Sequence, residues 1–251
     1  MPNLNEIVAY CDSLTRRSEV ADFLGANNGL QLQNNGTVTR VCAAVDAGRV
    51  PFQLAIEEGA DLLIVHHGLF WNTPASYSGA LFEKLKLAMD NNLAVYSSHL
   101  PLDAHPEFGN NRLLAKALGL EPLDWFLPYE GTPIALLAKA PPSREDLRNR
   151  LRKEFPEGFT AMEFGSAHPE KIAVLTGSGR SALDEMKGLG ADTLVTGELR
   201  QEHFNLAQEE GFNLYVCGHY ATERYGVTAL AGLIGDKFGL PASFIPTGCP
   251  L

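Results

Sequence analysis

Short apolar runs alternate with amphipathic stretches along most of the chain. A run of strand-like composition is usually followed by a segment whose apolar positions recur at helical spacing. This alternation predicts mainly parallel sheets with helices packed against them. Strands are expected at residues 41–45, 61–65, 93–96, 134–139, 171–175, 193–195, 214–217 and 243–245, and helices at 51–58, 80–91, 111–118, 143–154, 181–188, 201–210 and 219–238.

The pattern is interrupted once, at residues 121–132, which are rich in proline, glycine and aromatic residues. Such a composition is typical of a loop, and it predicts the connection between two lobes. Residues 1–125 would form the first lobe and residues 126–251 the second. The expected fold class is therefore α/β, with two related α/β lobes that contain mainly parallel sheets.

The two halves contain similar short sequences. A Gly-Arg pair at position 48 and a Gly-Ala-Asp triplet at position 59 recur at positions 179 and 190, so both are repeated at the same offset. An Asn-Leu-x-Val sequence at position 92 recurs at position 213. This agreement favours an internal duplication. The alternative is that unrelated βα units share glycine and alanine at their turns.

Composition narrows the class of protein. The chain has 251 residues, 45% of them hydrophobic, which is enough to bury a substantial core. A net charge of −10 disfavours binding to nucleic acid, whose phosphates it would repel. No apolar run is long enough to cross a membrane and the N-terminus does not resemble a leader, so we expect a cytoplasmic protein. The four cysteines form no CxxC pair and predict neither a disulfide scaffold nor a thiolate zinc site.

Three predicted strands run directly into side chains that bind metal ions. In open parallel sheets the ligand crevice lies outside the carboxyl ends of the strands, so these side chains are expected at one edge. Core histidines would not be expected at three strand ends. The residues are His66 and His67 after the strand at 61–65, His99 and Asp103 after 93–96, and His219 and Glu223 after 214–217.

The spacing of His219 and Glu223 adds to this pattern. They are four residues apart at the start of a predicted helix, so both side chains project from one face. Such a pair is weak evidence alone, because it also occurs as a surface hydrogen bond. Together with two adjacent imidazoles and the Asp103 carboxylate it is more specific. A mixed nitrogen and oxygen set suits Zn, Mn, Fe, Co or Ni rather than Ca.

Five segments together resemble the NIF-three-like family, whose bacterial members are labelled GTP cyclohydrolase 1 type 2 homologues. They are residues 28–31 (NGLQ), 63–68 (LIVHHG), 98–103 (SHLPLD), 195–198 (VTGE) and 219–223 (HYATE). The resemblance covers nearly the whole chain and indicates the short form without an inserted domain. Residues 100–102 (LPL) depart from the Thr-Asn-Leu often found before the family aspartate.

The resemblance implies a dinuclear site with two divalent metal ions per chain, in the cleft between the lobes. The matching ligands are His66, His67, Asp103, His219 and Glu223. It also implies a homo-oligomer, a toroidal homohexamer built as a trimer of dimers. No membrane or nucleic-acid partner is expected.

Two further residues are candidates for proton transfer. Glu198 follows His67 at the same offset that separates the repeated sequences, and it would face the site from the opposite lobe as a general acid/base or a supporting group. The alternative is a carboxylate stabilised by the dipole at a helix N-terminus. His99 could orient Asp103 or contact water, and Asp46, which ends the first strand, could support the histidines. For His203 a surface role is favoured over a catalytic one.

Three functions remain open at this stage. The first is a metal-dependent hydrolase acting on a nucleotide or phosphoester, since paired ions activate water and polarise carbonyl or phosphoryl groups. The second is a non-catalytic metal-binding, metal-delivery or interaction protein with structural ions. The third is a sugar- or nucleotide-binding α/β protein without metal. The sequence contains no phosphate-binding P-loop, and it does not identify a small-molecule substrate.

Overall fold

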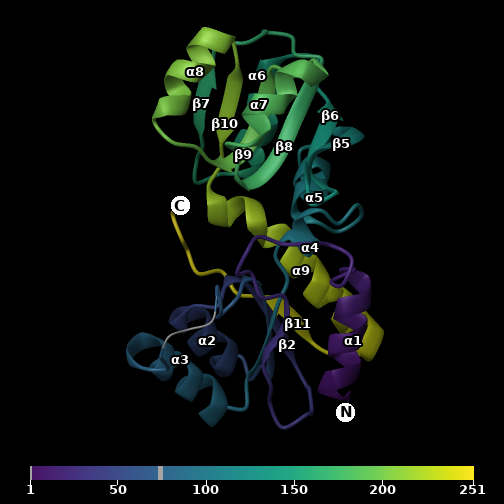
Figure 1. Ribbon diagram of the computed structural model, residues 1–251, viewed down its shortest axis with the longest axis vertical. Helices are drawn as coiled ribbons and strands as arrows, with labels where there is room; N and C mark the ends of the chain where they lie inside the picture. The colour runs from purple at the N-terminus through teal and green to yellow at the C-terminus, as the bar shows by residue number, and fades with distance from the viewer. Residues whose placement is uncertain (1, 73–75) are drawn as a thin grey trace. The chain divides into compact units, whose positions relative to one another are not determined.

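The computed structural model describes residues 2–72 and 76–251 (Figure 1). It confirms the α/β fold, with two separate sheets. The chain divides into two compact units. The first unit comprises Met1–Leu102 and Gly226–Gly248, and the second comprises Asp103–Tyr225 and Cys249–Leu251.

This division differs from the predicted halves, residues 1–125 and 126–251. The chain passes into the second unit at Asp103. The Asp103 carbonyl accepts from the side chain of Asn111, and this side chain also bonds to the Ile134 carbonyl and the Thr176 N–H of the second unit. Near its end the chain returns, since the strand that contains Ala242 pairs with the strand that begins at Val41. Local sequence patterns do not record such returns.

The first unit contains a five-stranded sheet in the order β1-β4-β3-β2-β11. Strands β11, β2, β3 and β4 pair in parallel, and β1 joins the β4 edge antiparallel. The elements are α1 (Leu4–Leu14), β1 (Gly29–Leu32), β2 (Val41–Asp46), α2 (Arg49–Glu57), β3 (Leu62–His67), α3 (Gly79–Asp90), β4 (Ala94–Ser97) and β11 (Ala242–Phe244). The helices α4 (Leu100–Asp103) and α9 (His219–Phe238) each contain a boundary between the units.

Both faces of this sheet are covered, which explains why its central strands are continuous apolar runs. On one face, alternate residues of β2, β3 and β4 pack against Phe52 and Ala55 of α2 and Ala88 of α3. On the other face, the hydroxyl of Tyr96 donates to Asp12 of α1. The strand ends are thereby held at fixed positions by a packed core on two sides.

The second unit contains a six-stranded sheet in the order β5-β6-β8-β9-β10-β7. Strands β8, β9 and β10 are parallel, while β5, β6 and β7 pair antiparallel at the two margins. The elements are α5 (Asn110–Ala117), β5 (Glu121–Tyr129), β6 (Thr132–Lys139), α6 (Arg144–Glu154), β7 (Thr160–Glu163), β8 (Lys171–Ser178), α7 (Ala182–Met186), the 3-10 helix η1 (Lys187–Leu189), β9 (Thr193–Glu198), α8 (Glu202–Glu210) and β10 (Asn213–Val216).

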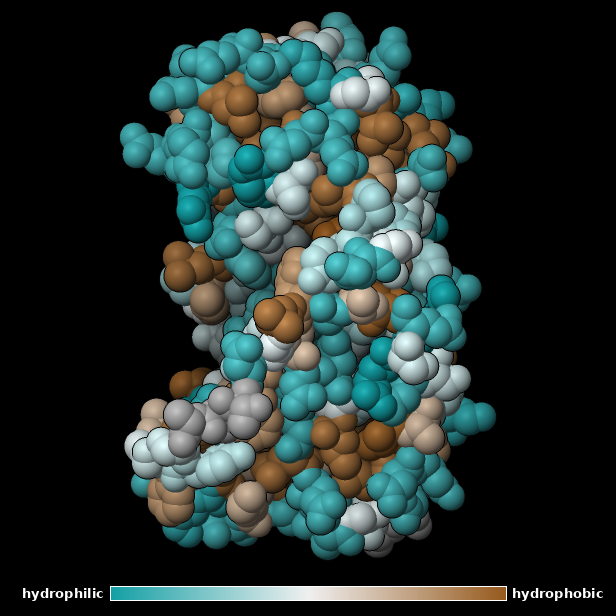
Figure 2. All heavy atoms as spheres, viewed as in Figure 1, coloured by the Kyte–Doolittle hydropathy of each residue, from teal (hydrophilic) through white to brown (hydrophobic). Residues whose placement is uncertain are grey.

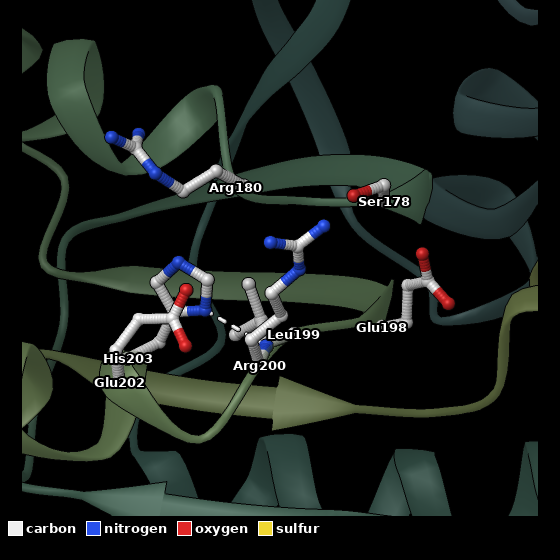
Figure 3. Close-up of a pocket in the computed structure, with 7 residues that line it drawn as sticks. All are labelled: Ser178, Arg180, Glu198, Leu199, Arg200, Glu202 and His203. Atoms are coloured by element: carbon white, nitrogen blue, oxygen red, sulfur yellow. Dashed lines mark hydrogen bonds between the residues drawn. The ribbon is translucent and has the colours of Figure 1, made fainter.

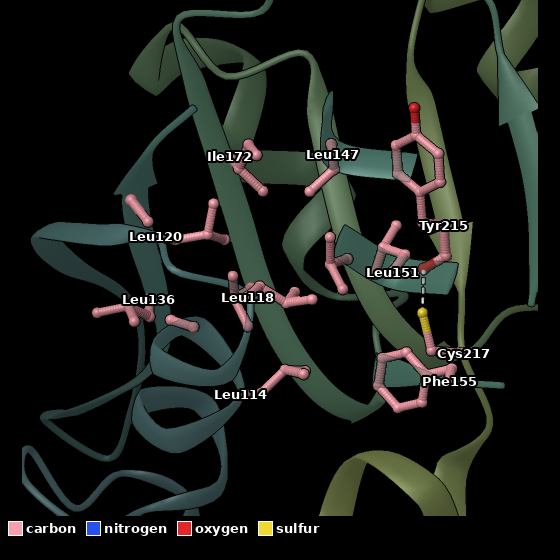
Figure 4. Close-up of a cluster of buried hydrophobic side chains, with 14 residues drawn as sticks. Leu114, Leu118, Leu120, Leu136, Leu147, Leu151, Phe155, Ile172, Tyr215 and Cys217 are labelled. Atoms are coloured by element: carbon pink, nitrogen blue, oxygen red, sulfur yellow. Dashed lines mark hydrogen bonds between the residues drawn. The ribbon is translucent and has the colours of Figure 1, made fainter. Parts of the chain in front are cut away.

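The alternation of side chains along these strands feeds two hydrophobic cores, one on each face of the sheet. On one face, α5 and α6 pack against residues that include Val174, Val195 and Tyr215 (Figure 4). On the other, α7 and α8 pack against residues that include Ala173 and Leu194. Ser143 caps α6 as expected, because its hydroxyl accepts from the Asp146 N–H.

Residues 121–132 were predicted to form a loop between two lobes, and this prediction was wrong. Residues 121–129 form β5, which pairs antiparallel with β6. Its prolines, Pro122 and Pro128, are tolerated because β5 is the outermost strand, where a missing N–H breaks no internal ladder. The edge strands β1 and β7 were also missed, since short, half-exposed strands have a weak apolar pattern.

The two units share their central pairing. In the first, Val41 pairs with Leu62 in parallel, and in the second Ile172 pairs with Thr193, so the two pairs are related by the offset of the repeated sequences. Each parallel set also ends on an antiparallel edge strand, β1 beside β4 and β7 beside β10. The structure thus confirms that the lobes are related in architecture.

The surface seen in Figure 2 is mainly hydrophilic, with hydrophobic side chains interspersed on it. Among the described residues, no helix has the length and apolar character needed to cross a membrane.

Candidate functional site

Three histidines lie together at the carboxyl edge of the sheet in the first unit. His66 and His67 are the last two residues of β3, and His99 follows β4. One ring nitrogen from each lies within 4.8 Å of the others. The rings of His66 and His67 are 4.8 Å apart between centroids, although they are neighbours on a strand. The end of the strand therefore presents both imidazoles to one place.

Each of these rings is held through its Nδ1 atom by an oxygen acceptor. Nδ1 of His66 lies 2.9 Å from the Ser98 carbonyl oxygen, and Nδ1 of His67 lies 2.9 Å from Oδ1 of Asp46. Nδ1 of His99 lies 2.8 Å from Oδ1 of Asp22. An acceptor at Nδ1 keeps the proton there and leaves the lone pair on Nε2, which is the tautomer that binds metal ions.

Asp22 was missed by the sequence analysis. Besides the His99 ring, its carboxylate accepts from the Leu100 N–H and from the Asn28 side-chain amide. Burial pushes its pKa upward, but the hydrogen bonds from His99, Asn28 and the Phe23 N–H outweigh burial and hold the pKa below its usual value. Asp22 lies in a loop without any strand or helix signal, and its contact with His99 spans 77 residues.

The segment at residues 28–31 braces the strand ends. The side-chain oxygen of Asn28 accepts from the His99 N–H at 2.7 Å, and that of Gln31 accepts from the Leu69 N–H at 2.6 Å. A Cβ at Gly68 would lie 2.3 Å from the Gln31 amide, so any other residue there would displace the side chain that holds the Leu69 N–H. Residues 28–31 and 63–68, two of the segments that carry the family resemblance, are therefore in direct contact.

The second unit brings together the three remaining predicted ligands. Oδ1 of Asp103 accepts from the Asn110 amide at 2.7 Å and from the Thr176 hydroxyl at 3.4 Å. Nε2 of His219 lies 3.1 Å from Oε1 of Glu223, as the i,i+4 spacing predicted. A carboxylate oxygen of Asp103 also lies within 4.8 Å of one of Glu223.

Two glycines make room for these side chains. A Cβ at Gly177 would lie 2.3 Å from Oε1 of Glu223, and its φ of +64° is unfavourable for other residues. A Cβ at Gly197 would lie 2.6 Å from the Thr222 hydroxyl and 2.7 Å from the backbone of His219. The first turn of α9 can approach the ends of β8 and β9 because both positions lack a side chain.

The charges in this set favour a bound cation. The pKa of His219 is raised to about 9, mainly by the hydrogen bond to Glu223, against the opposing effect of burial. Two neighbouring buried carboxylates repel one another unless a positive charge lies beside them. A proton on His219 supplies that charge here, and a divalent ion bound by the same atoms would replace it.

The two candidates for proton transfer differ in setting. Glu198 ends β9, and its Oε2 atom lies 3.3 Å from Nδ1 of His219, while 54% of its side chain is exposed. His99 lies among the first unit's histidines and bonds to Asp22. The surface role expected for His203 was wrong: this residue is buried and its Nδ1 accepts from the Arg200 N–H.

The donor chemistry of both units fits a divalent transition ion. The first unit supplies three imidazoles whose Nδ1 atoms are hydrogen-bonded to oxygen atoms. The second unit supplies two carboxylates and an imidazole. Nitrogen and oxygen donors of this kind suit zinc, manganese, iron, cobalt and nickel. The structure therefore contains His and Glu groups able to bind metal.

The whole chain matches one known family. The family profile described as Duf34/NIF3 (NGG1p interacting factor 3) matches residues 2–248. The chain belongs to this family. The resemblance noted from five short segments is thereby confirmed.

Curated relatives in this family share a name. A GTP cyclohydrolase 1 type 2 homolog of Deinococcus radiodurans is 41% identical over 225 residues, covering 88% of this chain and 86% of the relative. The Escherichia coli protein with the same name is 35% identical over 238 residues, covering 90% of each chain. The match extends over most of both chains in each case.

Solved structures agree with the fold. The crystal structure of TTHA1606 from Thermus thermophilus superposes with a TM-score of 0.89 at 36% identity, covering 100% of both chains. The solved structure of the protein ybgI, described as of unknown function, gives a TM-score of 0.92 at 30% identity, again covering 100% of both chains.

Proposed function

We propose that this NIF3-family chain binds two divalent metal ions and acts as a metal-dependent hydrolase. The ligands would be His66, His67, Asp103, His219 and Glu223, with Zn, Mn, Fe, Co or Ni as the metal. The observation that carries the proposal is the orientation of His66 and His67 in the first unit. Each has an oxygen acceptor at Nδ1, which leaves Nε2 as a donor to a cation.

The ligands of the second unit support the same proposal. Asp103 is fixed by Asn110 and Thr176, so its position does not depend on an ion being present. Glu223 and His219 occupy space that Gly177 and Gly197 leave open. A site whose ligands are fixed in advance loses little conformational entropy when it binds an ion.

Bound ions would polarise a carbonyl or phosphoryl group and favour the ionised form of an attacking water. The protein would supply the proton transfers. Glu198 is suited to accept and return a proton, because its carboxylate is half exposed and contacts His219. We also propose a role for His99 in proton transfer, with Asp22 stabilising its charged form.

The name of the curated relatives suggests a nucleotide or a related phosphoester as substrate. The alternative function is a non-catalytic metal-binding or interaction protein whose ions are structural or delivered elsewhere. It is favoured by the resemblance to a family named for an interacting factor. Both functions predict bound metal, but only the hydrolase predicts turnover of a substrate.

Elemental analysis of freshly purified protein is the first experiment. We expect two divalent ions per chain, and protein without stoichiometric metal would refute the proposal. Metal-loaded protein should then hydrolyse at least one member of a panel of nucleotides and phosphoesters. Full metal content with no turnover, together with a large fall in melting temperature on chelation, would favour the structural alternative.

The variant Glu223→Gln tests the second unit's part in binding. It keeps the size of the side chain and removes its charge, so we expect metal content to fall while the circular dichroism spectrum is unchanged. Asp184→Asn, an exposed carboxylate of the same unit paired with Arg180, is the matched control. Two ions per chain retained in Glu223→Gln would contradict the assignment.

Assembly and location are further proposals. The resemblance implies a homohexamer in the cytoplasm, and the native mass measured by light scattering would test the hexamer. A mass of one or two chains over the micromolar range would exclude it.

A further inference from the structure

A cavity of about 390 Å³ opens beside the proposed ligands, wholly within the second unit (Figure 3). It lies where β8 and β9 end and α8 begins. Ser178, Arg180, Glu198, Arg200 and His203 are among the residues that line it. The carboxyl edge of parallel strands is where open α/β sheets bind their ligands. The metal proposal uses only Glu198 of this lining.

Two arginines give one part of the cavity a positive charge. Arg180 follows β8 and pairs with Asp184, whereas the Arg200 side chain has no hydrogen bond or ion pair with the described residues. Both arginines are exposed, so their guanidinium groups are accessible to an anionic ligand. A guanidinium group fits the oxygens of a phosphate through two parallel hydrogen bonds.

His203 supplies an independent indication. Its side chain is buried, with 2% exposed, and its Nδ1 accepts from the Arg200 N–H at 2.9 Å. The neutral ring therefore has its proton on Nε2, and this buried atom has no partner among the described residues. Figure 3 shows the nitrogen on the side of the ring that faces Arg180. An unsatisfied buried donor is costly, and a ligand oxygen would satisfy it.

The acidic residues of the lining limit what the rest of the ligand can be. Glu198 and Glu202 also border the cavity and would repel a bare anion. Carboxylates accept hydrogen bonds from hydroxyl or amino groups. The start of α8, by contrast, favours the negative group through its N–H dipoles. A ligand with a phosphate at one end and hydroxyl groups at the other satisfies both parts.

We propose that this cavity binds the phosphate of a phosphorylated sugar or nucleotide through Arg180, Arg200 and His203. The hydroxyl-bearing part would then lie along Glu198, which contacts His219. This second step rests on the proposed metal site, since it directs the reacting part of the substrate toward the ligands. Phosphate binding itself does not depend on metal.

The test is calorimetric titration of the full chain with ribose 5-phosphate, ribose and inorganic phosphate, before and after removal of metal by chelation. We expect ribose 5-phosphate to bind more tightly than either part alone, with or without metal. Arg200→Gln and Arg180→Gln should each weaken binding roughly tenfold to hundredfold, because each removes a charged hydrogen-bonding partner. His203→Asn should weaken it less, since asparagine can still accept from the Arg200 N–H.

Arg152→Gln is the matched control, because Arg152 is an exposed arginine of the same unit that does not border the cavity. Equal affinity in all four variants, or no binding of any probe, would overturn the proposal. Binding that disappears on chelation would also overturn it, by placing the phosphate on the ions. Arginine-dependent binding in a protein that holds no metal would support the cavity and refute the proposed function instead.

Discussion

The strand ends of the two sheets carry opposite kinds of residue on the same framework. In the first unit Asp46 and His66 stand at the ends of β2 and β3, and the offset of the repeated sequences relates them to Gly177 and Gly197 in the second unit. The central strands pair in the same register from Val41 to Ala44 and from Ile172 to Leu175, and the pairing of β8 with β9 then shifts between Leu175 and Ser178. One sheet therefore places functional side chains on its own strands, whereas the other leaves those positions bare.

Gly177 and Gly197 leave space for side chains of the helix that packs on these strand ends. A Cβ at Gly177 or Gly197 would occupy space taken by Glu223, Thr222 and His219 of α9. The second unit therefore presents two of its three proposed ligands, His219 and Glu223, from a helix packed on strand ends that lack side chains. In the first, Asp22 and Asp46 hold the imidazoles from behind. The comparison indicates that one βα framework can position metal-binding residue types in two ways.

The largest effect is expected from filling an empty position, with Gly177→Ala. The new Cβ would lie 2.3 Å from Oε1 of Glu223 at a φ of +64°. Strain of this kind costs about 1–3 kcal/mol of unfolding free energy. Displacing Glu223 should lower metal affinity on the order of 100-fold or more, beyond the loss seen for outer partners. Metal titration and urea unfolding measure the two effects.

Gly188→Ala is the control for that variant, since a Cβ there meets nothing within 4 Å. It should leave metal affinity unchanged. If Gly177→Ala also binds two ions normally, the glycine is not needed for space, and the comparison between the two sheets fails at its central point.

The next effect concerns the partners behind the imidazoles, tested by Asp22→Asn. An amide has only one oxygen, so the Asn28 side chain and the Leu100 N–H, which share one carboxylate oxygen, both lose their acceptor if the amide oxygen stays with the His99 ring. We expect about 100-fold weaker metal binding and a loss of about 1–3 kcal/mol in unfolding free energy. Asp90→Asn, on the exposed end of α3, is the matched control and should change neither. Unchanged affinity in Asp22→Asn would mean that the hydrogen bonds of Asp22 do not support metal binding.

Much of the fold could be predicted because the signals are local. The central strands are apolar runs buried on both faces, and the helices between them have apolar faces of helical period. β5 could not be recognised, because an edge strand with Pro122 and Pro128 has the composition of a loop. The return of β11 to β2 was equally hidden, since it joins two segments that lie far apart in the sequence.

The candidate site divides in the same way. The predicted ligands follow strands or begin a helix, and the structure groups them in two sets. Asp22 was missed because only tertiary packing brings it to His99. Gly177 and Gly197 were also overlooked, although the offset between the repeated sequences, applied to Asp46 and His66, could have identified them. A glycine gives no chemical signal of its own, so its role could be recognised only by comparison with the related position in the other unit.

A smaller effect is expected at the other supporting acid, with Asp46→Asn. Asp46 holds Nδ1 of His67 as Asp22 holds His99, but 49% of its side chain is exposed compared with 6% for Asp22. Water can replace part of its role, so we expect about tenfold weaker metal binding and little change in stability. Isothermal titration with zinc would rank the two variants. A larger loss in Asp46→Asn than in Asp22→Asn would reverse the order of support that burial predicts.

The smallest effect on binding is expected from Glu198→Gln, at the strand end equivalent to His67. Its contact with His219 is half exposed, and such pairs contribute less than about 1 kcal/mol, so metal affinity should change by about fivefold or less. If Glu198 transfers protons, turnover of any identified substrate should fall about 100-fold or more, because glutamine cannot accept a proton. Glu210→Gln, a carboxylate of α8 that pairs with Lys187 and is not in the cavity lining, is the control. A loss of metal equal to that in Glu223→Gln would instead make Glu198 a ligand, and the second sheet would then resemble the first after all.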